Sequence, residues 1–164
     1  MTLSQGKERD NIRLESRWAV QSANITEAIF AVEPQFVHFA GHGDAKEGSI
    51  VVGDKDGFAH TIPVDALVEA LQVVGLGIRC VVVNACSTER LAQSLAAVGL
   101  CAIGMRQPVG DRSAVRFSVG FYQAVAAGQS AESAFGAGVA QLMMTPLGDD
   151  ARAPFLLCGG QQAR

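Results

Sequence analysis

"IRCVVVNA", residues 78–85, is the most strongly β-biased run in the chain and decides the class of the fold. A short, continuously apolar run of this kind is typical of a strand that is buried on both faces. Similar runs are "QFVHFA" at 35–40, "CAIGMR" at 101–106 and "PFLLCG" at 154–159, and we also expect a strand over residues 12–20. Segments with helical periodicity separate most of these runs.

Five helices are expected between the strands. "SANITEAIFAVEP" (22–34) predicts a helix with Asn24 as N-cap, Glu27 completing a capping box and Pro34 beyond its end. Further helices are expected at 63–74, 88–97, 111–127 and 131–144, and a hairpin that turns near Asp56-Gly57. Apolar strands that alternate with amphipathic helices predict an α/β fold whose mainly parallel sheet has helices on both faces.

Length and composition indicate one globular domain over residues 1–164, with 49% hydrophobic and 18% charged residues. No apolar stretch approaches the roughly 18 to 20 residues that span a bilayer, and the polar start "MTLSQGKERD" lacks a signal-peptide pattern. We therefore expect a cytoplasmic protein with no membrane partner. The net charge of −3 and the scattered Lys and Arg residues also argue against a nucleic-acid partner.

Three strand ends carry the candidate functional residues. In open α/β sheets the site lies outside the carboxyl ends of the strands. Those positions here hold Gly41-His42-Gly43, then Cys86, then Asp111. A cysteine nucleophile needs a histidine within hydrogen-bond reach, because the thiolate attacks and free thiols are mostly protonated at neutral pH. His42 and Cys86 are therefore the candidate catalytic pair, and the N–H groups of Gly43 and Cys86 are candidate oxyanion-hole donors.

Asp111 has two interpretations. An aspartate that opens a helix is commonly a first-turn acid, and a carboxylate beside a cysteine site would also bind a cationic substrate group. His38 lies within an apolar strand and is expected to be a hydrogen-bonded packing residue, while His60 is expected on the hairpin surface. His38 and His42 do not fit a zinc pair, because an i,i+4 pair converges on a metal only on a helix.

The remaining cysteines are expected to be structural. Cys80, Cys101 and Cys158 each lie in an apolar run and are interpreted as small buried hydrophobic residues. No CxxC pair or zinc-finger spacing occurs, so neither a metal site nor a disulfide framework is expected. No cofactor is expected either. A nucleotide-binding domain ranks low, because "GHGDAKEG" precedes a hairpin and no GxxxxGK[ST] loop occurs.

Three segments together resemble the CHAT domain, the bacterial caspase-like peptidases related to separase, caspases and gingipains. They are "VHFAGHG", "CVVVNACST" and "AIGMRQPVGDRSAVRFSVGFYQAVAAGQSAESAF", and the resemblance covers about residues 9–138. It implies a three-layer caspase-like sandwich and a cysteine endopeptidase with a His42–Cys86 dyad. It also implies an oxyanion hole from the N–H groups of Gly43 and Cys86. Carried over to Asp111, it implies a protein or peptide substrate that is cleaved after Arg or Lys. The family as a whole implies a role in a bacterial defence or signalling system.

The chain departs from the family pattern before the segment "RDNIRLESRWAV", where relatives usually have a strand and a helix and this sequence has only residues 1–8. We therefore expect the first β-α unit to be absent and the sheet to have an open edge. A homodimer or a partner chain could cover that edge. The alternative function is then a caspase-like interaction or regulatory module with weak or no catalysis.

Overall fold

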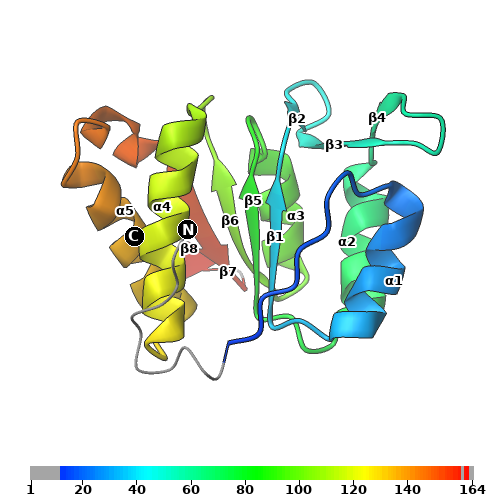
Figure 1. Ribbon diagram of the computed structural model, residues 1–164. Coiled ribbons are helices and arrows are strands. Elements are labelled where there is room, and N and C mark those ends of the chain that lie inside the picture. The colour runs from blue at the N-terminus through cyan, green and yellow to red at the C-terminus, as the bar shows by residue number, and fades with distance from the viewer. Residues whose placement is uncertain (1–11, 160, 163–164) are drawn as a thin grey trace.

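The five-stranded central sheet has the order β1-β5-β6-β7-β8 in the computed structural model, which describes residues 12–159 and 161–162 (Figure 1). Its members are β1 (Phe36–Ala40), β5 (Cys80–Asn84), β6 (Cys101–Met105), β7 (Pro154–Cys158) and β8 (Gln161–Gln162). β1, β5 and β6 are parallel, while β7 and β8 are antiparallel to their neighbours. The predicted strands at 35–40, 78–85, 101–106 and 154–159 are thereby confirmed.

Helices cover both faces of this sheet (Figure 1). α4 (Asp111–Ala126) and α5 (Ala131–Met143) pack on one face, and α1 (Ser22–Val32), α2 (Val64–Val74) and α3 (Glu89–Ala97) lie on the other. Along β5 the side chain of Val82 joins the α4–α5 cluster, whereas Val81 and Val83 join the opposite cluster. All three are fully buried, which explains the unbroken apolar run. The three-layer α/β sandwich is confirmed.

A second, antiparallel sheet lies beside the first and contains β2 (Gly43–Asp44), β3 (Ser49–Gly53) and β4 (Ala59–Thr61). The predicted hairpin is confirmed, with its turn at Gly57, whose φ of +83° favours glycine. Helices expected at 63–74, 88–97, 111–127 and 131–144 agree with the structure to within one residue at each end. Strands β2 and β8 and the 3-10 helix η2 (Gly148–Arg152) were not predicted.

The strand predicted over residues 12–20 is wrong, because this segment has no strand pairing in the structure. Its residues 14–20 run along one wall of a cavity whose other walls include residues 38–42 and 50–53. A β-strand exists only through its ladder hydrogen bonds, and none joins this segment to β1 within residues 12–159. Polar and apolar residues of the segment line the cavity alike, and Leu14 and Trp18 are exposed, so the apolar alternation does not mark a strand.

The capping box predicted at Asn24 and Glu27 is also wrong. α1 begins at Ser22, with Gln21 as its N-cap and no side-chain cap bond. Gln21 forms a parallel bridge with Gly53 and has extended backbone angles. That bridge fixes the backbone immediately before the helix, so α1 starts before Asn24 instead of after it.

In the part of the chain that the structure describes, no helix combines the length and the apolarity that crossing a bilayer requires.

Candidate active site

The loops after β1 and β5 touch each other through their backbones. A Cβ added at Gly43 would overlap the carbonyl oxygen of Cys86 and lie 3.2 Å from the Cys86 nitrogen. Gly41 N donates to Asn84 O at 3.5 Å, so the two loops begin to approach at the strand ends. Only a residue without a side chain fits at position 43. The sequence-predicted His42 loop and Cys86 loop are thus neighbours in space.

Hydrogen bonds of Thr88 fix the turn that contains Cys86, and the backbone of this turn is strained at Ser87. Ser87, the next residue, has a φ of +56°, a left-handed conformation that is uncommon outside glycine and costs energy. Thr88 is fully buried; its Oγ1 donates to Ala85 O at 3.2 Å and accepts from Met105 N at 3.2 Å. These bonds tie the turn to the end of β6. They leave the Cys86 side chain partly exposed above the strand ends.

The small sheet holds the His42 loop. His42 O accepts from Val51 N at 2.9 Å, and the Asp44 carboxylate accepts from Thr61 Oγ1 at 2.7 Å. The Thr61 hydroxyl, followed by the backbone N–H groups of Lys46 and Glu47, lowers the pKa of Asp44. The backbone of His42 is therefore anchored while its side chain is exposed to solvent.

Some of the expected contacts are not made. Within residues 12–159 no hydrogen bond joins the Cys86 thiol to the His42 ring. Asp111 is the exposed first residue of α4 and caps no helix with its side chain. The start of α4 lies at the same edge of the sheet as the ends of β1, β5 and β6 (Figure 1). Catalytic hydrogen bonds are often long before substrate binds. The backbone contact between the His42 loop and the Cys86 loop is therefore better evidence for a catalytic pair than a hydrogen bond between the two side chains.

A carboxylate that sequence reasoning did not single out lies next to the start of α4. Asp150, half-buried in η2, accepts a hydrogen bond from the buried Ser113 Oγ in the first turn of α4. Its sequence context, a polar turn, gives no signal of this contact. The bond anchors η2 against the helix that carries Asp111.

A cavity of about 440 Å³ opens beside the His42 loop. Its walls include Gly41, His42 and Ala85, and its remaining lining is largely apolar. The cavity connects the open side of β1 with the candidate catalytic loop. Concave, mainly apolar sites with a few polar groups are the usual form of a binding site.

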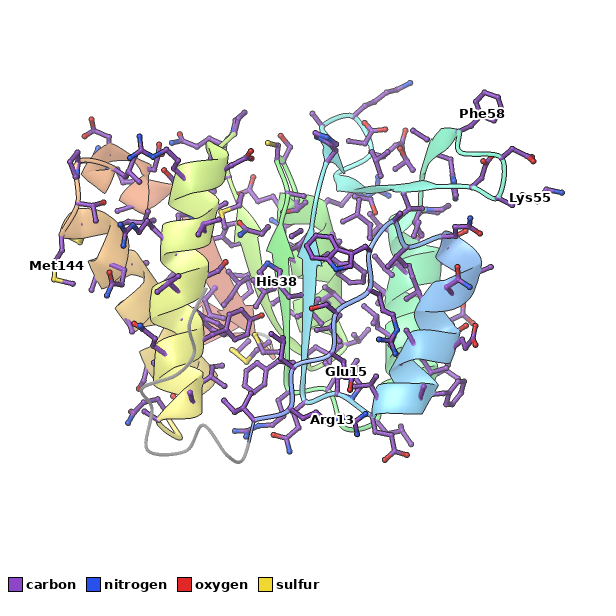
Figure 2. The ribbon with its side chains drawn as sticks, viewed as in Figure 1. Arg13, Glu15, His38, Lys55, Phe58 and Met144 are labelled. Atoms are coloured by element: carbon purple, nitrogen blue, oxygen red, sulfur yellow. A yellow bond between two sulfur atoms is a disulfide. The ribbon has the colours of Figure 1, made fainter. Side chains whose placement is uncertain are left out.

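His38 is a packing residue, as expected, but the expected hydrogen bond is missing at its Nε2 within residues 12–159. Its ring stacks on Tyr122 of α4 with centroids 5.6 Å apart. Figure 2 shows His38 in the middle of the molecule, between the sheet and the helices. Burial lowers the pKa of His38 from 6.5 to about 4. His60 lies exposed on β4, as predicted.

We expect His38 to make the fold less stable at mildly acidic pH. Between pH 6.5 and about 4 the unfolded chain binds a proton at His38 and the folded chain does not. The free energy of unfolding is therefore highest above pH 6.5, as far as His38 determines it, and it decreases as the pH drops towards 4. Denaturant titrations at several pH values check this, with His38→Phe as the comparison. Equal slopes against pH for both proteins would contradict it.

The prediction that Cys101 and Cys158 are separate buried hydrophobic residues is wrong. They form a disulfide between the facing positions of β6 and β7, with Cα atoms 4.0 Å apart. Their spacing of 57 residues gives no local signal, because the antiparallel return of β7 creates the contact. Cys80 stays a free, buried thiol, and burial together with the nearby Glu132 raises its pKa to about 12.

Comparison with known proteins agrees with the fold. The model of the CHAT domain, a family related to caspase-like cysteine peptidases, matches residues 2–156. No curated protein matches the chain. The matched range includes β1 to β6 together with His42, Cys86 and Asp111. The chain therefore belongs to the CHAT-domain family.

Proposed function

We propose that this protein is a cysteine endopeptidase in which His42 and Cys86 form the catalytic dyad. The observation that carries the proposal is the backbone contact between Gly43 and Cys86 in a chain of the CHAT family. It supports the assignment because a thiol and an imidazole on adjacent loops need only side-chain rotation to approach each other. The strained Ser87 is also consistent with a functional turn.

The proposed reaction is acyl transfer through a thioester. The Cys86 thiolate attacks the scissile carbonyl carbon, and the proton from its thiol is held on His42. His42 then protonates the leaving amine, and it later takes a proton from the water that hydrolyses the thioester. The N–H groups of Gly43 and Cys86 are assigned to the oxyanion that forms in both steps. No residue beyond the dyad is needed to move a proton.

Substrate selection is assigned to Asp111, which would pair with Arg or Lys at P1. An exposed carboxylate at the start of α4 can form a bidentate pair with a guanidinium group. A cytoplasmic role in a bacterial defence or signalling system is part of the same proposal and rests on the family relationship. The test is cleavage of fluorogenic peptides that differ only at P1. Cleavage after Arg and Lys but not after Asp is expected, and preference for Asp would contradict the assignment.

Replacing Asp111 should affect the basic substrate selectively. For Asp111→Asn we expect kcat/KM for an Arg peptide to fall by about 100-fold, because one charged partner of the guanidinium is lost. Asp65→Asn is a matched control, since Asp65 is also the acid in the first turn of an exposed helix start. If both variants cleave the Arg peptide at the wild-type rate, Asp111 is not the P1 determinant.

Gly43→Ala adds only one methyl group but should lower the peptidase rate strongly. The new methyl group would overlap the Cys86 carbonyl and push the two loops apart. A displacement of about 1 Å between catalytic groups costs on the order of 100-fold in rate. Gly41→Ala is the control, because a Cβ at Gly41 meets nothing within 4 Å. Similar peptidase rates for the two alanine variants would show that the contact does not govern activity.

Among the described residues β1 is an edge strand with no ladder partner on its outer side, which supports a second candidate function, a module that acts only with a partner chain. Gly41 N donates to β5 and Gln35 O accepts from the residues at the start of β5. Because backbone groups alternate in direction along a strand, the N–H and C=O groups of His38 and Ala40 point away from β5. Within residues 12–159 no backbone bond occupies them. A partner strand at this edge would pair with β1 and adjoin His42. A folded protein whose Cys86 stays unreactive until a partner is added would favour this function, and sedimentation would reveal whether the partner is a second copy.

A further inference from the structure

A second group of chemically reactive side chains lies at the opposite end of the sheet from His42 and Cys86. Cys101 is the first residue of β6, Cys158 is the last residue of the antiparallel β7, and the two face each other. Glu132, in the first turn of α5, has a carboxylate oxygen 3.7 Å from Cys158 Sγ. The two sulfur atoms and a carboxylate oxygen all lie within 4.8 Å of one another.

These three donors suit a thiophilic metal ion once the disulfide is reduced. Two thiolates and a carboxylate are ligands that Zn²⁺ accepts, with Zn–S distances near 2.3 Å and a tetrahedral arrangement that a water molecule can complete. Facing positions on neighbouring strands point their side chains to the same side of the sheet, so both sulfur atoms can reach one ion. The cysteines are half-buried and Glu132 is exposed, which leaves an open path for the ion.

We propose that Cys101, Cys158 and Glu132 form a redox-gated binding site for Zn²⁺ or another thiophilic divalent cation. In the oxidised protein the S–S bond uses both sulfur atoms and the site is closed. In the reduced protein the ion takes the place of the disulfide and links β6, β7 and the start of α5. Each state therefore has a cross-link at the same position of the fold.

The chemical steps balance with a small thiol as reductant. Two equivalents of that thiol supply two electrons and two protons to the Cys101–Cys158 bond, and they leave as their own disulfide. Binding of Zn²⁺ then breaks two S–H bonds, forms two Zn–S bonds and releases two protons to solvent. The Glu132 carboxylate contributes an oxygen ligand without a change of oxidation state. The ion itself is neither oxidised nor reduced.

Cys86 provides an internal control. It follows the far end of β5, in the candidate active site, whereas Cys80 begins β5 and faces Cys101. A metal bound by the proposed ligands should therefore be insensitive to substitution of Cys86.

The experiment is a titration of the phosphine-reduced, metal-free protein with Zn²⁺ in competition with a chromophoric chelator, repeated with Co²⁺. We expect one equivalent to bind, with a thiolate-to-cobalt charge-transfer band, and we expect the oxidised protein to bind none. Cys101→Ser and Cys158→Ser should lose the band, while Glu132→Gln should weaken binding by about tenfold or more. Cys86→Ser should bind as the wild type does. Circular dichroism of each reduced protein shows whether it is folded.

Other results would overturn the proposal. Reduced protein that binds no Zn²⁺, whether folded or not, excludes the site. A charge-transfer band that survives in Cys101→Ser or Cys158→Ser, or that disappears in Cys86→Ser, places the ion on other thiols. Because the reference protein is already reduced, the serine variants lose no cross-link that the reference retains. Glu132→Gln keeps both thiols, so it tests the carboxylate separately.

Discussion

Cys86→Ala should reduce cleavage of an Arg-P1 peptide by on the order of 10⁴-fold or more, because it removes the atom that forms the thioester. The substitution removes one sulfur atom from a partly exposed turn, so the fold should survive. The backbone N–H of residue 86 remains in place, and a small residual rate from oxyanion stabilisation is consistent with the mechanism. Steady-state kinetics with circular dichroism of both proteins provides the measurement.

Cys80→Ala is the matched control for that result. Cys80 begins β5, the strand that precedes the Cys86 turn, but its thiol is fully buried and its raised pKa keeps it protonated at neutral pH. We expect this variant to retain peptidase activity. Loss of activity in Cys80→Ala but not in Cys86→Ala would reverse the assignment of the nucleophile. Equal activity of Cys86→Ala and the wild type would exclude the thioester mechanism.

The second large effect should come from the disulfide. Replacing both Cys101 and Cys158 with alanine is expected to lower the free energy of unfolding by about 4 kcal/mol in oxidising buffer, since the closed loop spans 57 residues. The bond joins β6 to β7, so the loss should appear as earlier global unfolding in guanidinium chloride. Oxidised and reduced wild type, both free of metal, should differ by a similar amount.

Peptidase activity serves as the control for the disulfide prediction. The bond lies at the amino ends of the parallel strands, away from the carboxyl ends that carry His42 and Cys86. Activity at low temperature should therefore change little when the bond is absent. A change in unfolding free energy below about 1 kcal/mol would contradict the cross-link's role in stability.

Periodicity and strand ends were sufficient to predict most of the fold. Residues 80–84 are buried or half-buried on both faces of the sheet, so their apolar run indicates a central strand. The helices that cover this strand have apolar residues along the face that contacts it. The carboxyl-end rule then predicted three candidate residues at one edge of the sheet. Family membership, shown by the CHAT model, agrees with the resemblance read from those loops.

The features that escaped prediction depend on contacts that no local pattern encodes. The alternating residues 12–20 resemble a strand, but no neighbouring strand in the described part of the chain pairs with them. The disulfide depends on the register of β7 against β6. The left-handed Ser87 depends on how Thr88 is fixed beneath the turn, and the sequence "ACST" carries no glycine to signal it.

Intact-mass analysis after incubation with a peptidyl-arginine chloromethyl ketone tests the proposed dyad most directly. We expect a single adduct on Cys86 of the folded protein, no adduct in Cys86→Ala, and much slower labelling in His42→Ala because the imidazole helps to form the thiolate. The matching peptidyl-aspartate reagent should label poorly. A folded protein that acquires no adduct at any pH, or that labels equally fast without His42, would contradict the account.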